Sequence, residues 1–246
     1  MKNNLALRIE EASLNAWTPF QQLLYDGWIL RFAEAYTKRA NSVNPIFESS
    51  IDLNKKINFC EELFTSKNLQ SVFRLNSFSK TNELEEILIQ RNYEFLHRTS
   101  VQFIELENLD LTSSPKIRNT QNLDEWISVF EDLSGGTTRL NSIHKKLIEN
   151  IPLKKNLMIL EDSGKVVSCG LGVLEDDFIG IFDVVTHQSF RKKGFGRMIV
   201  NNLMSWGKIH GAKISYLQVM THNLAAWSLY EKIGFKEIYN YWYRVK

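Results

Sequence analysis

The chain contains 246 residues, of which 43% are hydrophobic and 24% are charged, and its formal net charge is +2. These values are ordinary for a soluble globular protein with enough residues for one large or two modest domains. The near balance of 30 Lys and Arg against 28 Asp and Glu argues against a dedicated nucleic-acid-binding protein. No segment approaches the ~20 apolar residues of a membrane span, and the charged N-terminal stretch is not typical of a signal peptide. We therefore expect a cytoplasmic protein without a nucleic-acid or membrane partner.

The two cysteines, Cys60 and Cys169, lie far apart in the sequence and lack the spacing of metal ligands. Cys60 belongs to a helical pattern, and Cys169 stands beside Gly170 in a strand pattern. We expect both thiols to be reduced and buried, and we expect no metal site.

The first half of the chain alternates strand-like and helix-like patterns. The expected elements, in chain order, are strands at 27–32 and 37–43, a helix at 52–67, a strand at 71–75, a helix with its stop within 83–95, and a strand at 99–106. Polar residues, with Ser113, Ser114 and Pro115 among them, then separate two apolar patterns. This segment predicts a domain boundary near residue 112, which divides the chain into domains 1–112 and 113–246.

The second half has clearer patterns. The expected elements are helices at 123–133 and 137–151 around Gly135-Gly136, strands at 156–161 and 165–175 joined by a turn at 162–164, a strand at 179–187, a helix that ends at Gly211, a strand at 214–220, a helix at 223–233 that ends at Gly234, and a strand at 239–245. Segments 85–95 and 226–237 each continue from a helix through Asn or Gly to an aromatic residue, which favours a duplicated unit. These patterns together predict a mixed α/β sheet protein.

A glycine segment, Arg191-Lys192-Lys193-Gly194-Phe195-Gly196, lies between a β-branched strand and a long helix. Glycines allow the backbone to approach a ligand closely, and the free N–H groups at a helix start attract anions. The segment therefore predicts an anion site, although a tight turn with solvated cations would have the same sequence. The corresponding part of the first half, 44–54, contains Pro45 and no glycine, so we expect no equivalent site there.

The second half, over roughly residues 116–246, resembles the GNAT superfamily of acyl-CoA-dependent N-acyltransferases. Arg191, Gly194 and Gly196 match the first signature of that superfamily. The second signature, an Asn and then a Tyr on the next helix before Gly-Phe, is matched by Asn223, Tyr230, Gly234 and Phe235. The whole chain looks like a tandem member of the superfamily with a degenerate first copy.

The resemblance implies that acetyl-CoA binds in the second half as a cosubstrate. Its pyrophosphate would lie over the loop, on N–H groups from Lys192 through Phe195 and Gly196 to Arg197. Of the basic side chains Arg191, Lys192, Lys193 and Arg197, we expect one or two to meet phosphates and the rest to face water. The strand residues Val184, Val185 and Thr186 would pair their backbone with the pantetheine amides, and an N–H of the same strand would serve the developing oxyanion.

Tyr230 lies seven residues after Asn223, on the same face of the helix. A phenol is protonated at neutral pH, so Tyr230 is the candidate general acid for the departing thiolate, and a core aromatic is the alternative. Asn223 either contacts the coenzyme or simply caps its helix.

The sequence leaves three alternatives for the general base: Asp183, Glu175 and a relay of water molecules. Asp183 is the carboxylate inside the central strand, where burial invites a perturbed pKa, whereas Glu175 and Asp176 lie nearer a turn. The alternative for Asp183 is pairing with a core donor. Two loop histidines, His187 and His222, are expected to be surface residues.

Three polar residues of the first half, Arg39, Asn41 and Ser42, lie on an extended run. They either reach the cleft between the two copies or bond to neighbouring turns.

The sequence thus predicts an N-acetyltransferase that moves an acetyl group from acetyl-CoA to an amine by direct attack in a ternary complex, because no Cys or Ser nucleophile has a base partner. A catalytically silent acyl-CoA-binding regulatory module is the alternative. A nucleotide-binding protein is a weaker one, since the glycine segment lacks a Gly-Lys-Ser/Thr ending. The acceptor is left open between a small amine, an amino acid, a peptide and a protein lysine, and no oligomeric state is indicated.

Overall fold

The computed structural model describes residues 2–79, 81–111, 114, 116–135 and 138–246. The elements of the first half are α1 (Lys2–Asn15), β1 (Gln21–Tyr25), β2 (Trp28–Phe32), the 3-10 helix η1 (Lys38–Ala40), β3 (Ser42–Pro45), α2 (Leu53–Ser66), β4 (Val72–Asn76), α3 (Asn82–Gln90) and β5 (Glu94–Glu105). The predicted boundary at residue 112, with Ser113 and Pro115, lies outside the described residues, so the division into two domains stays a prediction.

The elements of the second half are β6 (Ile117–Thr120), α4 (Leu123–Ser134), α5 (Thr138–Glu149), β7 (Lys154–Asp162), β8 (Lys165–Glu175), β9 (Phe178–Thr186), η2 (Gln188–Phe190), α6 (Phe195–Ile209), β10 (Ile214–Met220), α7 (Leu224–Ile233) and β11 (Lys236–Val245). They confirm the predicted order from α4 onward, whereas strand β6 was not predicted. Gly135 ends α4 in a left-handed conformation, and the Ser163-Gly164 turn, with both φ angles positive, joins β7 to β8.

The predicted strand at 37–43 is wrong over most of its length, because β3 begins only at Ser42. The side chain of Asn41 explains the difference. Its Oδ1 accepts from the N–H groups of Ala33 and Ala35, and its Nδ2 donates to the carbonyls of Ala33 and Thr37. These local bonds hold the chain in a turn that includes η1 instead of a strand ladder.

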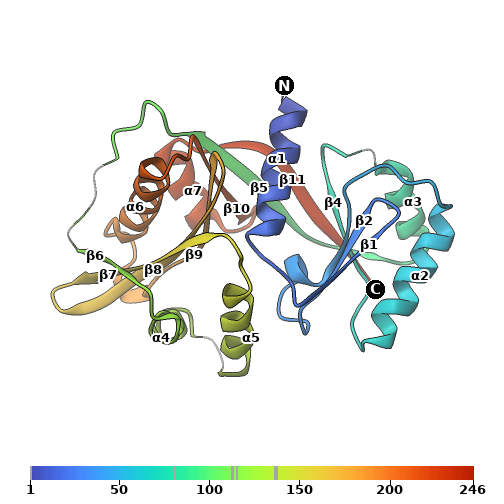
Figure 1. Ribbon diagram of the computed structural model, residues 1–246, viewed down its shortest axis with the longest axis horizontal. Helices are drawn as coiled ribbons and strands as arrows, with labels where there is room; N and C mark the ends of the chain where they lie inside the picture. The colour runs from blue at the N-terminus through green and yellow to red at the C-terminus, as the bar shows by residue number, and fades with distance from the viewer. Residues whose placement is uncertain (1, 80, 112–113, 115, 136–137) are drawn as a thin grey trace.

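Within the described residues one 11-stranded sheet runs through both halves, in the order β1-β2-β3-β4-β11-β5-β10-β9-β8-β7-β6. The last strand of each half is exchanged: β11 pairs with β4 and β5, and β5 pairs with β10 and β11. Figure 1 shows these two long strands crossing between the halves. The predicted mixed α/β sheet is therefore confirmed, and the hydrogen-bonded ladder itself links the two halves.

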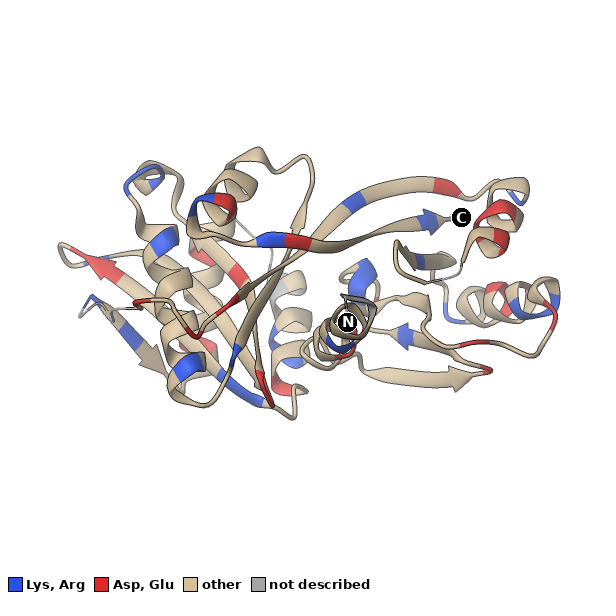
Figure 2. Cartoon of the chain, turned by 90° about the horizontal axis from the view of Figure 1, so that it is seen from above, with Lys and Arg blue, Asp and Glu red and all other residues tan. Residues whose placement is uncertain are grey.

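Helix α1 was not predicted, and it lies against the sheet between the two halves (Figures 1 and 2). Its Glu10 is fully buried and forms an ion pair with the guanidinium of Arg74 on β4, with Arg74 Nη2 donating to Oε2 at 3.0 Å. The hydroxyl of Tyr239 on β11 donates to the same carboxylate at 2.5 Å. Because a buried charge is costly without partners, this cluster ties α1 to β4 and to the exchanged strand β11.

The two halves repeat the order β-β-α-β-α-β, from β2 to β5 and from β8 to β11. Each repeat contains one parallel strand pair joined through a helix, β3 with β4 through α2 and β9 with β10 through α6.

Figure 2 shows Lys/Arg and Asp/Glu positions interspersed over both halves. Both cysteines are free and buried, as predicted.

Candidate active site

Strands β9 and β10 form a fork. They pair in parallel only where Phe178–Ile181 faces Ile214–Leu217. Beyond that point β9 continues against β8 with a register shift, and Asp183 has a φ of 50°. Such a bulge bends the strand and increases its twist, which turns the rest of β9 away from β10. A cavity of about 470 Å³ is lined by the ends of both strands at this fork.

The glycine segment forms the loop that leads into α6. Lys192 has a φ of 62° and Gly194, the residue that caps the helix, has a φ of 86°. The first intrahelical bond runs from the N–H of Met198 to the carbonyl of Gly194. Within the described part of the chain, the N–H groups from Lys192 to Arg197 have no backbone or side-chain acceptor. This arrangement has the free donors and the helix dipole of an anion site.

The basic side chains of the loop differ in their contacts. The Nε of Arg191 donates to the carbonyl of Thr186 at 3.3 Å, and Nη2 of Arg197 donates to the carbonyl of Lys232 at 2.5 Å. The ammonium of Lys193 lies 5.1 Å from the centre of the Phe190 ring. The two arginines therefore brace the loop, and phosphate contacts by these side chains stay a prediction.

Close packing positions the start of α6 beside β9. A Cβ atom added to Gly170 of β8 would lie 2.6 Å from Cγ2 of Ile199, so only glycine allows the helix to pack this closely on the sheet. At Gly196 an added Cβ would lie 3.3 Å from Leu229 on α7. The predicted contact strand, Val184, Val185 and Thr186, forms the half-buried end of β9 next to this loop.

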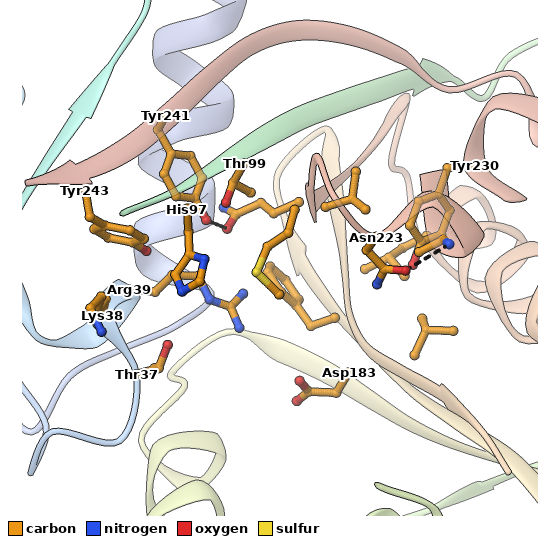
Figure 3. A pocket seen from close by; sticks show the side chains of 17 residues that line it. Thr37, Lys38, Arg39, His97, Thr99, Asp183, Asn223, Tyr230, Tyr241 and Tyr243 are labelled. Carbon is orange, nitrogen blue, oxygen red and sulfur yellow. Dashed lines mark hydrogen bonds between the residues drawn. The ribbon is translucent and has the colours of Figure 1, made fainter. Parts of the chain in front are cut away.

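Tyr230 and Asn223 both line the cavity from α7 (Figure 3). Asn223 caps the helix, because its Oδ1 accepts from the N–H of Ala226 at 3.2 Å. The residue Tyr230 is 9% exposed, and burial raises the pKa of its phenol to about 12. Its hydroxyl has no hydrogen-bond partner among the described residues. Tyr230 thus presents a protonated phenol at the cavity, as the candidate acid role requires.

Asp183 also lines the cavity, from the bulge of β9 (Figure 3). Nε2 of His144 on α5 donates to its Oδ2 at 2.9 Å, so the open question whether Asp183 pairs with a core donor is answered. His144 is 0% exposed. Its ring contacts four aromatic rings, those of Trp17, Tyr36, Trp126 and Phe130. The carboxylate is therefore held in one orientation at the edge of an apolar cluster.

Sequence reasoning missed His144. The available signal was a polar residue within the buried stripe of α5, between Ile143 and Leu147. A histidine in such a stripe does not reveal its partner, which is 39 residues away in the sequence.

The other titratable candidates lie outside this cavity. Glu175 accepts from Asn15 at 3.1 Å, and Asp176 pairs with Arg8 at 3.4 Å, both beside the β8–β9 turn. His187 accepts from the N–H of Ser189 within its own turn, and His222 is exposed. None of the four is a lining residue.

The first half supplies most of the opposite wall of the cavity. This wall comprises Thr37, Lys38 and Arg39 at η1 and His97 and Thr99 of β5, together with Tyr241 and Tyr243 of β11, the last strand of the second half. Arg39 thus reaches the cleft, whereas Asn41 bonds to the neighbouring turn, and Ser42 is buried in β3 with its carbonyl and hydroxyl accepting from Asn44. Of the two alternatives predicted for residues 39, 41 and 42, contact with the cleft therefore holds for Arg39, and bonding to neighbouring residues holds for Asn41 and Ser42.

In the first half, the loop before α2 corresponds to the glycine segment, and a protein carboxylate already occupies its donors. Asp26, in the β1–β2 turn, accepts from the N–H groups of Ser50 and Ile51. These bonds hold the pKa of Asp26 well below its usual range. Lys56 pairs with the same carboxylate at 3.2 Å. Asp26 therefore satisfies these N–H donors of the loop, although a cavity of about 580 Å³ lies beside it.

Two family models match the chain. The Acetyltransferase (GNAT) family matches residues 121–235, and the C-terminal region of the probable histone acetyltransferase Rv0428c matches residues 7–129. The uncharacterized N-acetyltransferase YobR of Bacillus subtilis (strain 168) is 29% identical over 97% of this chain and 98% of its own length.

Solved structures share the fold. A GCN5-related N-acetyltransferase from Kribbella flavida has a TM-score of 0.75 at 13% identity, over 98% of this chain and 95% of its own. A tandem GNAT protein from the clavulanic acid biosynthesis pathway has a TM-score of 0.59 at 9% identity, over 75% of this chain and 67% of its own.

The described part of the chain has no helix with the length and apolar run needed to cross a bilayer.

The two family matches together span both halves, and the similar structures extend over most of the chain. Residues 121–235 therefore belong to the GNAT family of acetyltransferases, and the chain has the tandem form of the GNAT fold.

Proposed function

We propose that this enzyme transfers an acetyl group from acetyl-CoA to an amine acceptor by direct attack in a ternary complex. The fork between β9 and β10 carries the proposal, because it opens beside the unpaired N–H groups at the start of α6 and has Tyr230 and Asp183 on its walls. Acetyl-CoA supplies an activated thioester to this site.

The residues available fit the coenzyme's anionic and amide groups. The N–H groups of Lys192 to Arg197 are free to bind a pyrophosphate, and Gly194 supplies the backbone angle that aims them. Beyond Ile181, β9 has no partner on the β10 side within the described residues, so Val184 to Thr186 can pair with pantetheine amides. An N–H of the same edge is the proposed donor to the oxyanion.

Two side chains are proposed to move the protons. Asp183 takes the proton of the acceptor ammonium, directly or through water, and His144 holds the carboxylate in place. The neutral amine then attacks the thioester carbonyl, which forms the C–N bond and the oxyanion. When this intermediate collapses, the C–S bond breaks and the hydroxyl of Tyr230 donates its proton to the departing thiolate. The nitrogen of the new amide gives up its second proton, through water, to the Tyr230 phenolate, which restores the phenol. The raised pKa keeps Tyr230 in its donor form at neutral pH.

We assign the chemistry to the proposed domain 113–246 and most of the acceptor wall to the proposed domain 1–112. The cytoplasm is the proposed compartment, since both cysteines are free thiols and buried.

The test measures thiol release from acetyl-CoA by the purified chain with and without mixtures of primary amines. Release that depends on the amine, together with detection of the acetylated amine by mass spectrometry, is the expected result. Calorimetric binding of acetyl-CoA without any amine-dependent release would instead favour a silent acyl-CoA-binding module. Competition of ATP with CoA at equal concentrations would indicate a nucleotide site.

A further inference from the structure

The acceptor wall of the cavity carries positive charge. Lys38 and Arg39, both from η1, line it, and neither forms an ion pair with a carboxylate in the described part of the chain. A charged side chain in a partly buried cavity wall is usually paired with a neighbouring side chain of opposite charge. Two cations without such a neighbour therefore favour a ligand with negative charge.

Arg39 is held in a defined position. Its guanidinium lies 4.6 Å from the centre of the Trp17 ring, and its carbonyl accepts from Nη1 of the buried Arg31 at 2.9 Å. Figure 3 shows its side chain pointing into the cavity from the first-half wall. A stacked guanidinium retains its planar set of donors, which match the two oxygens of a carboxylate.

The opposite wall carries the single carboxylate among the described lining residues, Asp183. The phenol of Tyr36 interacts with both Asp183 and Arg39. Burial and Asp183 raise its pKa to about 12, and Arg39 acts in the opposite direction. Arg39 and Asp183 therefore lie close enough to act on one hydroxyl group. Figure 3 shows them on facing walls. The cavity is dipolar, with a place for an ammonium at Asp183 and a place for an anion at Arg39.

The coenzyme does not account for Arg39. The residues of the loop before α6, where its phosphates are proposed to bind, do not line this cavity. An amine acceptor without an acidic group would displace water from Arg39 and leave the guanidinium without a partner, which is unfavourable.

We infer that the acceptor is a small molecule that carries a carboxylate together with its primary amine, as a free amino acid does, and that Arg39 binds the carboxylate. This inference rests on the proposed function and specifies the acceptor class for the same site. Arg39 acts on acceptor affinity and has no part in binding acetyl-CoA.

The test compares the standard amino acids with the amines obtained by removing their carboxyl groups. Each compound is titrated calorimetrically into the enzyme in the presence of CoA, so that no turnover occurs. For at least one pair, we expect the carboxylate-bearing member to bind about tenfold more tightly or better, the usual range for charge-assisted hydrogen bonds. Arg39→Gln should abolish this preference and leave CoA binding unchanged.

Arg8→Gln is the matched control, because the Arg8 guanidinium also lies over a ring, that of Phe178, but outside the cavity. It should retain the preference. The inference is wrong if no amino acid binds more tightly than its decarboxylated counterpart, or if both variants behave alike. Preferential binding without thiol release would support the dipolar pocket and contradict the proposed function, so the two failures are distinguishable.

Discussion

Replacing Tyr230 with Phe removes one hydroxyl group and retains the ring. The ring packs edge to face against Phe235, with centroids 6.0 Å apart, and the hydroxyl has no protein partner among the described residues. The free energy of unfolding should therefore change by no more than about 0.5 kcal/mol. Acetyl-CoA affinity should also be unchanged, because the lost interaction belongs to the transition state.

Turnover should fall by about 10²-fold, the usual effect of one general acid, which corresponds to about 2.7 kcal/mol of activation free energy. Burial raises the pKa of Tyr230 to about 12, and an acid stays protonated below its pKa. The ratio of wild-type to variant turnover should therefore stay constant up to about pH 10.

The assay is steady-state thiol release at saturating acetyl-CoA with an acceptor from the amine panel. Tyr216→Phe is the matched control, since Tyr216 is a buried tyrosine of the same half that does not line the cavity. It should retain full turnover. Equal turnover of Tyr230→Phe and wild type would refute the acid role and leave Tyr230 as a core aromatic.

Gly194→Val should weaken acetyl-CoA binding strongly in calorimetry, because a β-branched residue resists a φ of 86°. Gly211→Val introduces the same kind of strain beyond the other end of α6 and should not weaken binding. Equal losses of affinity in the two variants would contradict the loop assignment. One acetyl-CoA should bind per chain, because Asp26 occupies the donors of the first-half loop, and a calorimetric stoichiometry of two would show that the first half retains a site. His144→Phe should keep the aromatic contacts and lower turnover about tenfold, within the range expected for a misplaced base, with unchanged acetyl-CoA affinity. The double variant with Asp183→Asn should lose no more turnover than Asp183→Asn alone, and additive losses would mean that His144 does not act through Asp183.

Local patterns were sufficient wherever neighbouring residues decide the structure. The left-handed turn at Ser163-Gly164, the loop into α6 and the stop at Gly234 all depend on backbone angles that glycine or a turn residue permits. The resemblance to the GNAT superfamily rested on the same short segments. Helix α1 was missed because its buried stripe contains small residues such as Ala6 and Ala12, together with the charged Glu10, and shows little contrast.

The contacts that shape the candidate site join residues far apart in the sequence. Strands β5 and β11 both mix apolar and polar residues along their length, so nothing in either strand specifies that it pairs across the two halves. Hydrogen bonds join His144 of α5 to Asp183 of β9, and Asp26 of the β1–β2 turn to the loop before α2. Arg39 reaches the acceptor wall because Asn41 bends the chain before β3. A hydrogen bond of this kind depends on where distant elements pack, and the periodicity of a single segment contains no information about its partner.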